Sequence, residues 1–347
     1  TGEKLLEKQK NNLINAINNE GLAGYFQINQ NLIKYKTGHW GFGLGLAAFG
    51  QAKLPKSLVE LGLYGNEFEQ PVRIDDLDME ILTFGNINLN YGNEFRHEKI
   101  NQYVEHFYWG IGLDFLVGGF YQNLEKMTGY IMTRQDGFDL KSDVVTRFGS
   151  GGLGFALDLG MTAQINEKLS ASLSLQNAIS YINWGMFWNS FYHNENAGKI
   201  KYSYDLKINS PEFFSDELDS LLKNAETEDS VYALENFHTG IPAGYNLSGT
   251  YRINEKIKFS GAVYGYLTKE YGLDFIPKVA VSCTYYPVEW WPVIIGLGTT
   301  KGNHPAWSFG TGLKFNHYHL DVGLSQYGGM FNKSKGFYFN MDQSFYF

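Results

Sequence analysis

The stretch LGFALDLGMTAQI, residues 153–165, decides the fold because apolar residues occupy every second position along it. One face carries Leu153, Phe155, Leu157, Leu159, Met161, Ala163 and Ile165, and the other carries Gly154, Ala156, Asp158, Gly160, Thr162 and Gln164. A β-strand points successive side chains to opposite faces, so this pattern predicts a strand with one apolar face. Soluble strands usually have roughly 5–6 residues, whereas a membrane strand needs roughly 9–11. The stretch is therefore predicted to cross a membrane.

The same alternation recurs in residues 109–118, 169–176, 307–315 and 318–325. Lipid would contact the apolar face of each strand, and a wet or filled interior would contact the other face. The strands must close into a barrel, because lipid cannot satisfy the hydrogen-bonding groups of a free sheet edge. The alternative is a soluble β-sandwich with one solvated face. The strand length and the 24 Tyr, 26 Phe and 7 Trp residues argue against it.

The composition argues against several other classes of protein. No apolar run approaches the roughly 20 residues that a membrane helix needs, and the longest candidate, residues 290–298, is far shorter. A helical membrane protein is therefore excluded. The single cysteine, Cys283, excludes a disulfide framework and a cysteine-rich metal site. The net charge of -8 argues against nucleic acid as a partner.

Two similar segments orient the predicted strands. Residues 164–169 (QINEKL) and 252–257 (RINEKI) each separate two alternating strands, and Asn suits a tight turn because it tolerates left-handed backbone. In outer-membrane barrels, short turns belong to the periplasmic side and long loops to the exterior. Segments 51–78, 122–151 and 184–236 are therefore predicted as long exterior loops.

The pattern as a whole predicts an all-β fold, a single transmembrane antiparallel up-and-down β-barrel within residues 22–347. Thirteen strands are predicted at 22–36, 38–50, 79–92, 105–121, 152–166, 168–183, 237–253, 256–268, 275–287, 292–301, 306–316, 318–327 and 336–347. Single-chain bacterial barrels normally have an even number of strands. We therefore expect about fourteen, with one further strand either preceding Thr1 or overlooked in the count.

Two short helices are predicted in the exterior segments. Residues 3–18 carry apolar residues at helical spacing and form an exterior helical segment, residues 1–21. Residues 211–223 begin with Pro211 at the first helical position after Ser210 as N-cap. These helices either pack over the barrel mouth or present a lid or a partner-docking surface.

Charged and polar residues on the predicted inward faces are the candidate lining of the interior. They are Asp114, Asp158, Gln164, Lys258, Lys314, His319, Asp321 and Asp342. Unpaired charge is costly in a low-dielectric interior, so one interpretation is that these residues hydrogen-bond with water, a plug or one another. The other interpretation is that they line a permeation path.

Aromatic residues are predicted to gather at the exterior rim. This exterior aromatic cluster consists of Trp184, Phe187, Trp188, Phe191 and Tyr192. Aromatic girdles are expected at both membrane interfaces of a barrel, and an entry site for a hydrophobic ligand is the alternative.

No catalytic or metal-binding set is visible in the sequence. No serine lies in a Gly-x-Ser-x-Gly elbow with suitable partners. His317 and His319 flank Tyr318, but no carboxylate or thiolate pattern completes a metal site. Gly41, Gly43 and Gly45 lie in a glycine-rich strand rather than a phosphate loop, because no helix follows. We therefore expect no enzyme activity, no cofactor and no metal.

The hairpin sequence also carries a family resemblance. Residues 151–160, 165–170 and 175–179, ending in Asn183-Trp184, resemble the recurring mid-barrel hairpin of the FadL-like superfamily of outer-membrane barrels. Similar hairpins occur in PorV-type secretion barrels and in a branch without assigned function, which the layout resembles most. Phe347, at the end of an alternating strand, resembles the signal read by the outer-membrane assembly machinery.

The resemblance implies fourteen strands and two functional expectations. FadL members carry hydrophobic compounds past a plug, so one expectation is passive uptake of hydrophobic or small solutes. PorV members bind a secretion translocon and its cargo, so the other is a non-enzymatic accessory or structural subunit that docks an outer-membrane, secretion or surface component. Expected partners are the lipid bilayer, lipopolysaccharide or detergent on the barrel exterior, and an outer-membrane protein. The expected location is the outer membrane.

Overall fold

The computed structural model describes residues 6–17, 21–135, 137–185, 197–208, 226–233, 237–273, 275–299, 305–327 and 336–345. The helices are α1 (Glu7–Ala16), α2 (Lys56–Tyr64), α3 (Glu98–Asn101) and the 3-10 helix η1 (Glu270–Gly272). The strands are β1 (Leu22–Thr37), β2 (Trp40–Leu54), β3 (Val72–Arg73), β4 (Asp78–Glu94), β5 (His106–Arg134), β6 (Gly137–Gln164), β7 (Leu169–Trp184), β8 (Ala197–Ile208), β9 (Glu226–Ala233), β10 (Phe237–Thr239), β11 (Gly244–Arg252), β12 (Ile257–Tyr266), β13 (Lys278–Val288), β14 (Trp291–Thr299), β15 (Pro305–Phe315), β16 (Tyr318–Tyr327) and β17 (Gly336–Phe345).

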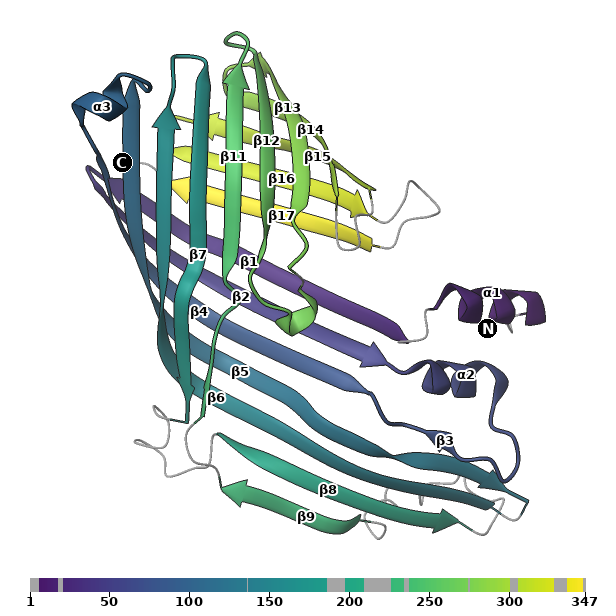
Figure 1. The fold of residues 1–347 in the computed structure, drawn as a ribbon. Coiled ribbons are helices and arrows are strands. Elements are labelled where there is room, and N and C mark those ends of the chain that lie inside the picture. The colour runs from purple at the N-terminus through teal and green to yellow at the C-terminus, as the bar shows by residue number, and fades with distance from the viewer. Residues whose placement is uncertain are drawn as a thin grey trace.

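Thirteen of these strands form the wall of a nearly closed barrel (Figure 1). Their order is β1-β2-β4-β5-β6-β7-β11-β12-β13-β14-β15-β16-β17, and each is antiparallel to the next. The prediction of an antiparallel membrane barrel with thirteen visible strands is confirmed. The remaining strands are additions, because β3, β10 and β8 pair with β5, β7 and β6, and β9 pairs with β8.

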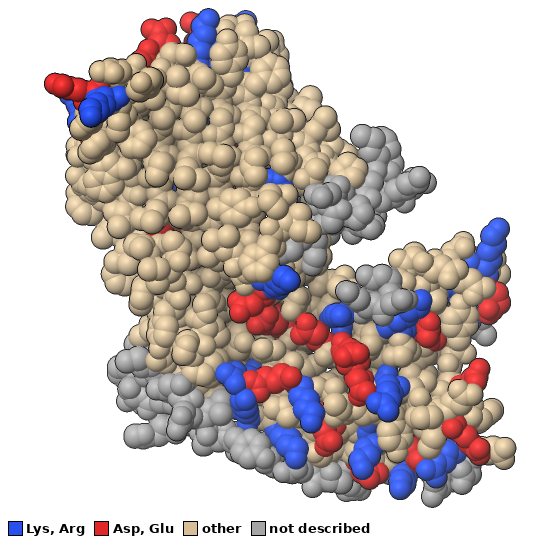
Figure 2. All heavy atoms as spheres, in the orientation of Figure 1, with Lys and Arg blue, Asp and Glu red and all other residues tan. Residues whose placement is uncertain are grey.

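The outer face of the wall is apolar, as the alternation requires. On β2, for example, Phe42, Leu44 and Leu46 are exposed, while Gly43 and Gly45 between them are buried. Figure 2 shows that Lys, Arg, Asp and Glu gather at the two ends of the molecule and leave the wall between them almost free of charge on the face drawn. Within the described residues, no helix is long and apolar enough to span a membrane. An apolar wall on an almost closed barrel is the structure of an outer-membrane β-barrel.

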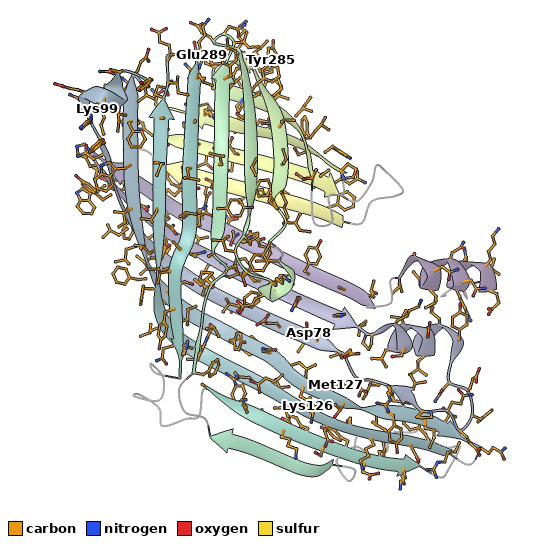
Figure 3. All side chains as sticks on the ribbon, viewed as in Figure 1. Asp78, Lys99, Lys126, Met127, Tyr285 and Glu289 are labelled. Atoms are coloured by element: carbon orange, nitrogen blue, oxygen red, sulfur yellow. The ribbon has the colours of Figure 1, made fainter. Side chains whose placement is uncertain are left out.

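Short turns lie together at one end, which we call the periplasmic end. Both Asn-Glu-Lys segments are turns of the same kind. Asn166 Oδ1 accepts hydrogen bonds from the backbone N–H groups of Lys168 and Leu169, and Asn254 Oδ1 accepts them from Lys256 and Ile257. In Figure 3, Tyr285, Glu289 and Lys99 mark this end, and Lys126 and Met127 lie toward the exterior end.

The exterior segments contain more regular structure than predicted. Residues 122–151 are not a loop, because β5 and β6 continue through them as one hairpin and have 29 and 28 residues. The apolar alternation stops where the strands leave the lipid. The backbone hydrogen bonds between β5 and β6 do not depend on that alternation, so the strands stay paired beyond it. Segment 51–78 contains the end of β2, α2 and β3, and segment 184–236 contains β8 and β9. The predicted helix 211–223 lies outside the described residues.

The wall has one seam, between β17 and β1. Twelve antiparallel steps separate these strands, so they run in the same direction, and among the described residues no backbone ladder joins them. Side chains hold the seam instead. Asp342 Oδ2 accepts bonds from Lys34 Nζ at 2.8 Å and Asn31 Nδ2 at 3.1 Å, and Gln343 Nε2 donates to the Leu32 carbonyl oxygen at 2.9 Å.

Candidate functional site: the barrel interior

An apolar cluster lies inside the barrel, toward its exterior end. We call it the constriction. Its buried members are Phe49, Leu82, Phe84, Leu116, Tyr121, Ala156, Ile182, Trp184, Ala197, Ile241 and Tyr271. They come from eight strands or connections that are spread along the sequence. Because Leu82, Ala156, Ile182 and Trp184 are 0% exposed, solvent does not reach them.

Trp184, at the end of β7, is the largest side chain of the constriction. Its ring stacks against Tyr121 at 5.8 Å and Phe237 at 6.3 Å between centroids, and its Nε1–H donates to Thr239 Oγ1 at 2.9 Å. Glycine makes room for the ring, because a Cβ on Gly118 would lie 2.7 Å from two of its atoms. The constriction therefore depends on one large ring packed against the bare backbone of β5.

Two connections fold inward to complete the constriction. The predicted strand 237–253 is split into β10 and β11 by a segment that includes Pro242, which has no N–H for a ladder. Ser180 of β7 ties this segment down, since its hydroxyl donates to the Ile241 carbonyl at 3.1 Å and accepts from the Ile241 N–H at 2.8 Å.

The second connection is η1, which joins β12 to β13 and contacts β2 and β1. The Tyr271 N–H donates to Glu80 Oε2 at 3.2 Å, and the Tyr121 hydroxyl donates to Glu80 Oε1 at 3.4 Å. Tyr271 adopts φ of 54°, in the left-handed region that a bulky residue rarely occupies. Burial and the nearby Glu80 carboxylate raise the pKa of the Tyr271 phenol, so this side chain stays neutral.

A cavity of about 1160 Å³, lined by polar and apolar residues, lies on the periplasmic side of the constriction, and we call it the chamber. Its polar lining includes Asn31, Lys34, Asn86, Asn88, Asn90, Asp114, Asp158, Ser174, Gln176 and Ser344. Three asparagines of β4 form a ladder along its wall, opposite the three glycines of β2: Asn86 faces Gly45, Asn88 faces Gly43 and Asn90 faces Gly41. The glycines leave the volume that the amides fill, because a Cβ on Gly45 would lie 2.6 Å from Asn86 Oδ1.

Two carboxylates complete the chamber wall. Asp114 Oδ1 accepts hydrogen bonds from Asn86 Nδ2 at 3.1 Å and Asn88 Nδ2 at 2.7 Å. Asp158 Oδ1 accepts the backbone N–H of Asn177 at 2.7 Å. The chamber thus offers a ligand both acceptors and donors, since Lys34, Lys36 and Arg96 line it as well as the two carboxylates.

The structure brings together only some of the residues predicted to line the interior. Asp114 and Asp158 line the chamber. Asp342 lies in the seam, and Gln164 lies at the periplasmic end of β6, where its Nε2 donates to the Asn166 carbonyl at 2.5 Å.

The other predicted lining residues lie on β12, β15 and β16, away from the chamber. Lys314 Nζ donates to the Tyr286 hydroxyl at 3.3 Å, and Lys314 is opposite His319 in the ladder. Asp321 lies opposite Gly312 and Asp342, and Lys258 lies opposite Thr284.

Trp184, predicted to belong to an aromatic cluster at the exterior rim, ends β7 on the exterior side and is fully buried in the constriction. The strand pattern ends at this residue, and what covers it is β10, which arrives from more than fifty residues later in the chain. Phe187, Trp188, Phe191, Tyr192 and Phe347 lie outside the described residues.

Sequence reasoning missed the asparagine ladder and most of the constriction. The signal for the ladder was present, because NINLN at residues 86–90 alternates Asn with Ile and Leu. Most residues considered as lining were charged, and Gln164 was the one amide among them, although a neutral amide is far cheaper than a charge to place inside a barrel. Among the described residues, no group of three or more His, Cys, Asp or Glu side chains is placed to hold a metal ion.

Comparisons with known proteins give one family match. A family model described as "Family of unknown function (DUF5723)" matches residues 1–146 and 136–323. No curated protein matches the chain.

Three solved structures are similar to the chain at low identity. A crystal structure of a Pseudomonas aeruginosa FadL homologue has a TM-score of 0.47 at 12% identity, covering 88% of this chain and 69% of that one. For the Pseudomonas putida toluene transporter TodX the TM-score is 0.40 at 9% identity, covering 86% and 76%. For the CymD monoaromatic hydrocarbon channel it is 0.39 at 10% identity, covering 88% and 80%.

Proposed function

The chain belongs to the DUF5723 family of unknown function, and on that premise we propose that it mediates passive uptake of small or hydrophobic solutes across the outer membrane. The observation that supports this most is the arrangement of the interior. A chamber of about 1160 Å³ lies at the periplasmic end behind an apolar constriction. A purely structural barrel has no need of a cavity large enough for a solute.

The constriction accounts for selectivity in this proposal. An apolar barrier without water disfavours ions and strongly hydrated solutes, because they would lose hydration without gaining partners. An apolar solute loses little there and gains contacts with Trp184, Phe84 and Leu82. Passage requires the connections that complete the constriction to shift, and η1 and the segment at Pro242 are the elements whose movement would widen it.

Uptake of the apolar fluorescent dye N-phenylnaphthylamine by intact cells tests the proposal. The lipopolysaccharide layer slows the dye, which becomes fluorescent on reaching phospholipid. Cells with few other porins that express the chain should take up the dye faster than cells without it. Trp184→Ala should raise the rate further because it opens the constriction. The matched control is Phe115→Ala, which truncates an aromatic ring of β5 on the lipid side, where it is 52% exposed.

Equal rates of dye uptake in cells with and without the chain, at matched expression, would rule out uptake of apolar solutes. A rate that rises equally with Trp184→Ala and Phe115→Ala would show a general membrane defect rather than a path through the barrel.

A second function, that of an accessory subunit, is favoured by the sheet beyond the membrane. β3, β5, β6, β8 and β9 extend the wall at the exterior end, where charged side chains gather (Figures 1 and 2). Part of that charge forms a network, in which Glu125 pairs with Arg147 and Lys199 at 2.5 Å each. Ordering a sheet that extends this far into water costs conformational entropy, and contacts with another molecule would offset that cost.

Purification from native membranes in mild detergent tests this second function. A stable partner that co-purifies reciprocally, and is lost when the hairpin tip 127–144 is replaced by a two-residue turn, would support it. Recovery of the chain only as a monomer would count against it.

A further inference from the structure

Two carboxylates of the chamber have no cationic partner among the described residues. Asp114 is only 5% exposed, and it accepts both of its hydrogen bonds through Oδ1. No described residue donates a hydrogen bond to its second oxygen, although Asp114 lines the cavity. Asp158 receives only a backbone N–H. None of the ion pairs of the described chain includes either residue, and Lys34 is already paired with Asp342 at 2.8 Å.

The two carboxylates are close enough to share one ligand group. In the ladder between β5 and β6, Asp114 is opposite Ala156 and Asp158 is opposite Gly112, so the two aspartates are diagonal neighbours on one face. Such neighbours are about 7–8 Å apart between Cα atoms. A small cation between them would contact both side chains.

Burial makes such a cation favourable. A carboxylate inside a membrane barrel has lost much of its hydration, and hydrogen bonds from neutral amides restore only part of it. A ligand with a positive charge restores more, through charge-assisted hydrogen bonds. The second oxygens of Asp114 and Asp158, to which no described residue donates, suit a group with several N–H donors.

An apolar wall lies directly beside the carboxylates. Leu116 follows Asp114 two positions later on β5 and therefore shares its face, and Ala156 is opposite Asp114; both belong to the constriction. Both side chains are buried, so a ligand that places its charge at the aspartates directs its remaining atoms toward this apolar cluster rather than toward further charges.

We propose that the chamber binds small amphipathic primary amines, with the ammonium group between Asp114 and Asp158 and the apolar body directed toward the constriction. The inference deepens the proposed uptake function by naming a solute class, and it rests on that function for its role in the cell. Asp114 and Asp158 are then the specificity-determining residues.

Calorimetric titration of the purified chain in detergent tests the inference with three probes of one shape. Phenethylamine carries the ammonium group, phenethyl alcohol is neutral, and hydrocinnamate is an anion. The amine should bind tightest and the anion weakest. Asp114→Asn and Asp158→Asn should each weaken amine binding by about 10-fold or more, the loss of one charge-assisted bond, and leave alcohol binding unchanged. Asp205→Asn, an exposed carboxylate of β8, is the matched control and should have no effect.

Amine binding no tighter than alcohol binding, or unchanged by both aspartate variants, would overturn the inference. So would amine binding that is abolished when potassium replaces N-methylglucamine in the buffer, because the site would then be one for inorganic cations. Circular dichroism of each variant shows that it is folded, and the alcohol titration provides a second check. Dye uptake without amine binding would defeat this inference alone, whereas amine binding without dye uptake would defeat only the uptake function.

Discussion

Replacement of Gly118 by Ala tests whether the constriction is packed as tightly as the structure indicates. The added Cβ would lie 2.7 Å from Trp184 Cη2 and Cζ3 and 3.1 Å from Gly152 Cα. Trp184 cannot yield easily, because it is fully buried and its Nε1–H is held by Thr239. Overpacking of this kind costs about 1–3 kcal/mol.

Gly160→Ala is the matched control for this substitution. Gly160 also faces the interior, on β6, but its Cβ would meet only the Leu173 carbonyl oxygen at 4.0 Å. Both variants gain the roughly 0.5–1 kcal/mol by which Ala is favoured over Gly within a strand. The difference in unfolding free energy between the two variants is therefore the overpacking cost alone, about 1–3 kcal/mol.

Equilibrium unfolding in guanidinium, followed by circular dichroism on the protein in liposomes, measures that difference. Trp184→Phe in the Gly118→Ala background should recover part of the loss, with a coupling free energy of about 0.5–3 kcal/mol because the two residues touch. Equal stability of Gly118→Ala and Gly160→Ala would refute the packing described here.

Substitutions at three other residues test separate parts of the fold. Glu80→Ala should lower the free energy of unfolding by about 1–3 kcal/mol, since it leaves the buried N–H of Tyr271 without its acceptor. Glu80→Gln keeps an acceptor oxygen and should lower it less. Chemical unfolding of both variants measures the difference. Asn166→Ala should cost about 1 kcal/mol by removing the acceptor of two turn N–H groups, and no loss in the unfolding midpoint would contradict the turn. Asp342→Asn should lower the free energy of unfolding by at most about 1 kcal/mol, because the ion pair with Lys34 is partly exposed and therefore screened by salt. A loss of stability that is equally large in high salt would contradict this.

Strand positions were largely predictable from the sequence because the signal is local. In residues 153–165 the polarity of each side chain indicates which face of the sheet it lies on. Most predicted strand ends agree with the structure to within a few residues. The Asn166 and Asn254 turns were equally visible, since their hydrogen bonds join residues two or three positions apart.

The interior was less predictable because its contacts are not local. Glu80 and Tyr271 are 191 positions apart, and nothing near Tyr271 in the sequence shows that η1 turns inward. The burial of Trp184 was not predictable for the same reason, since Phe237 and Thr239 cover it from a distant connection. The hairpin beyond the membrane was missed because backbone pairing, unlike lipid contact, leaves no polarity pattern.

Thiol labelling of the chamber tests most directly the claim that the constriction separates it from the exterior. In a Cys283→Ser background, Asn88→Cys places one thiol in the chamber. A membrane-impermeant maleimide should label it quickly from the periplasmic side in spheroplast-derived outer membranes and slowly from outside intact cells. Adding Trp184→Ala should make it react quickly from both sides. Fast labelling from outside intact cells with Trp184 in place would contradict the account.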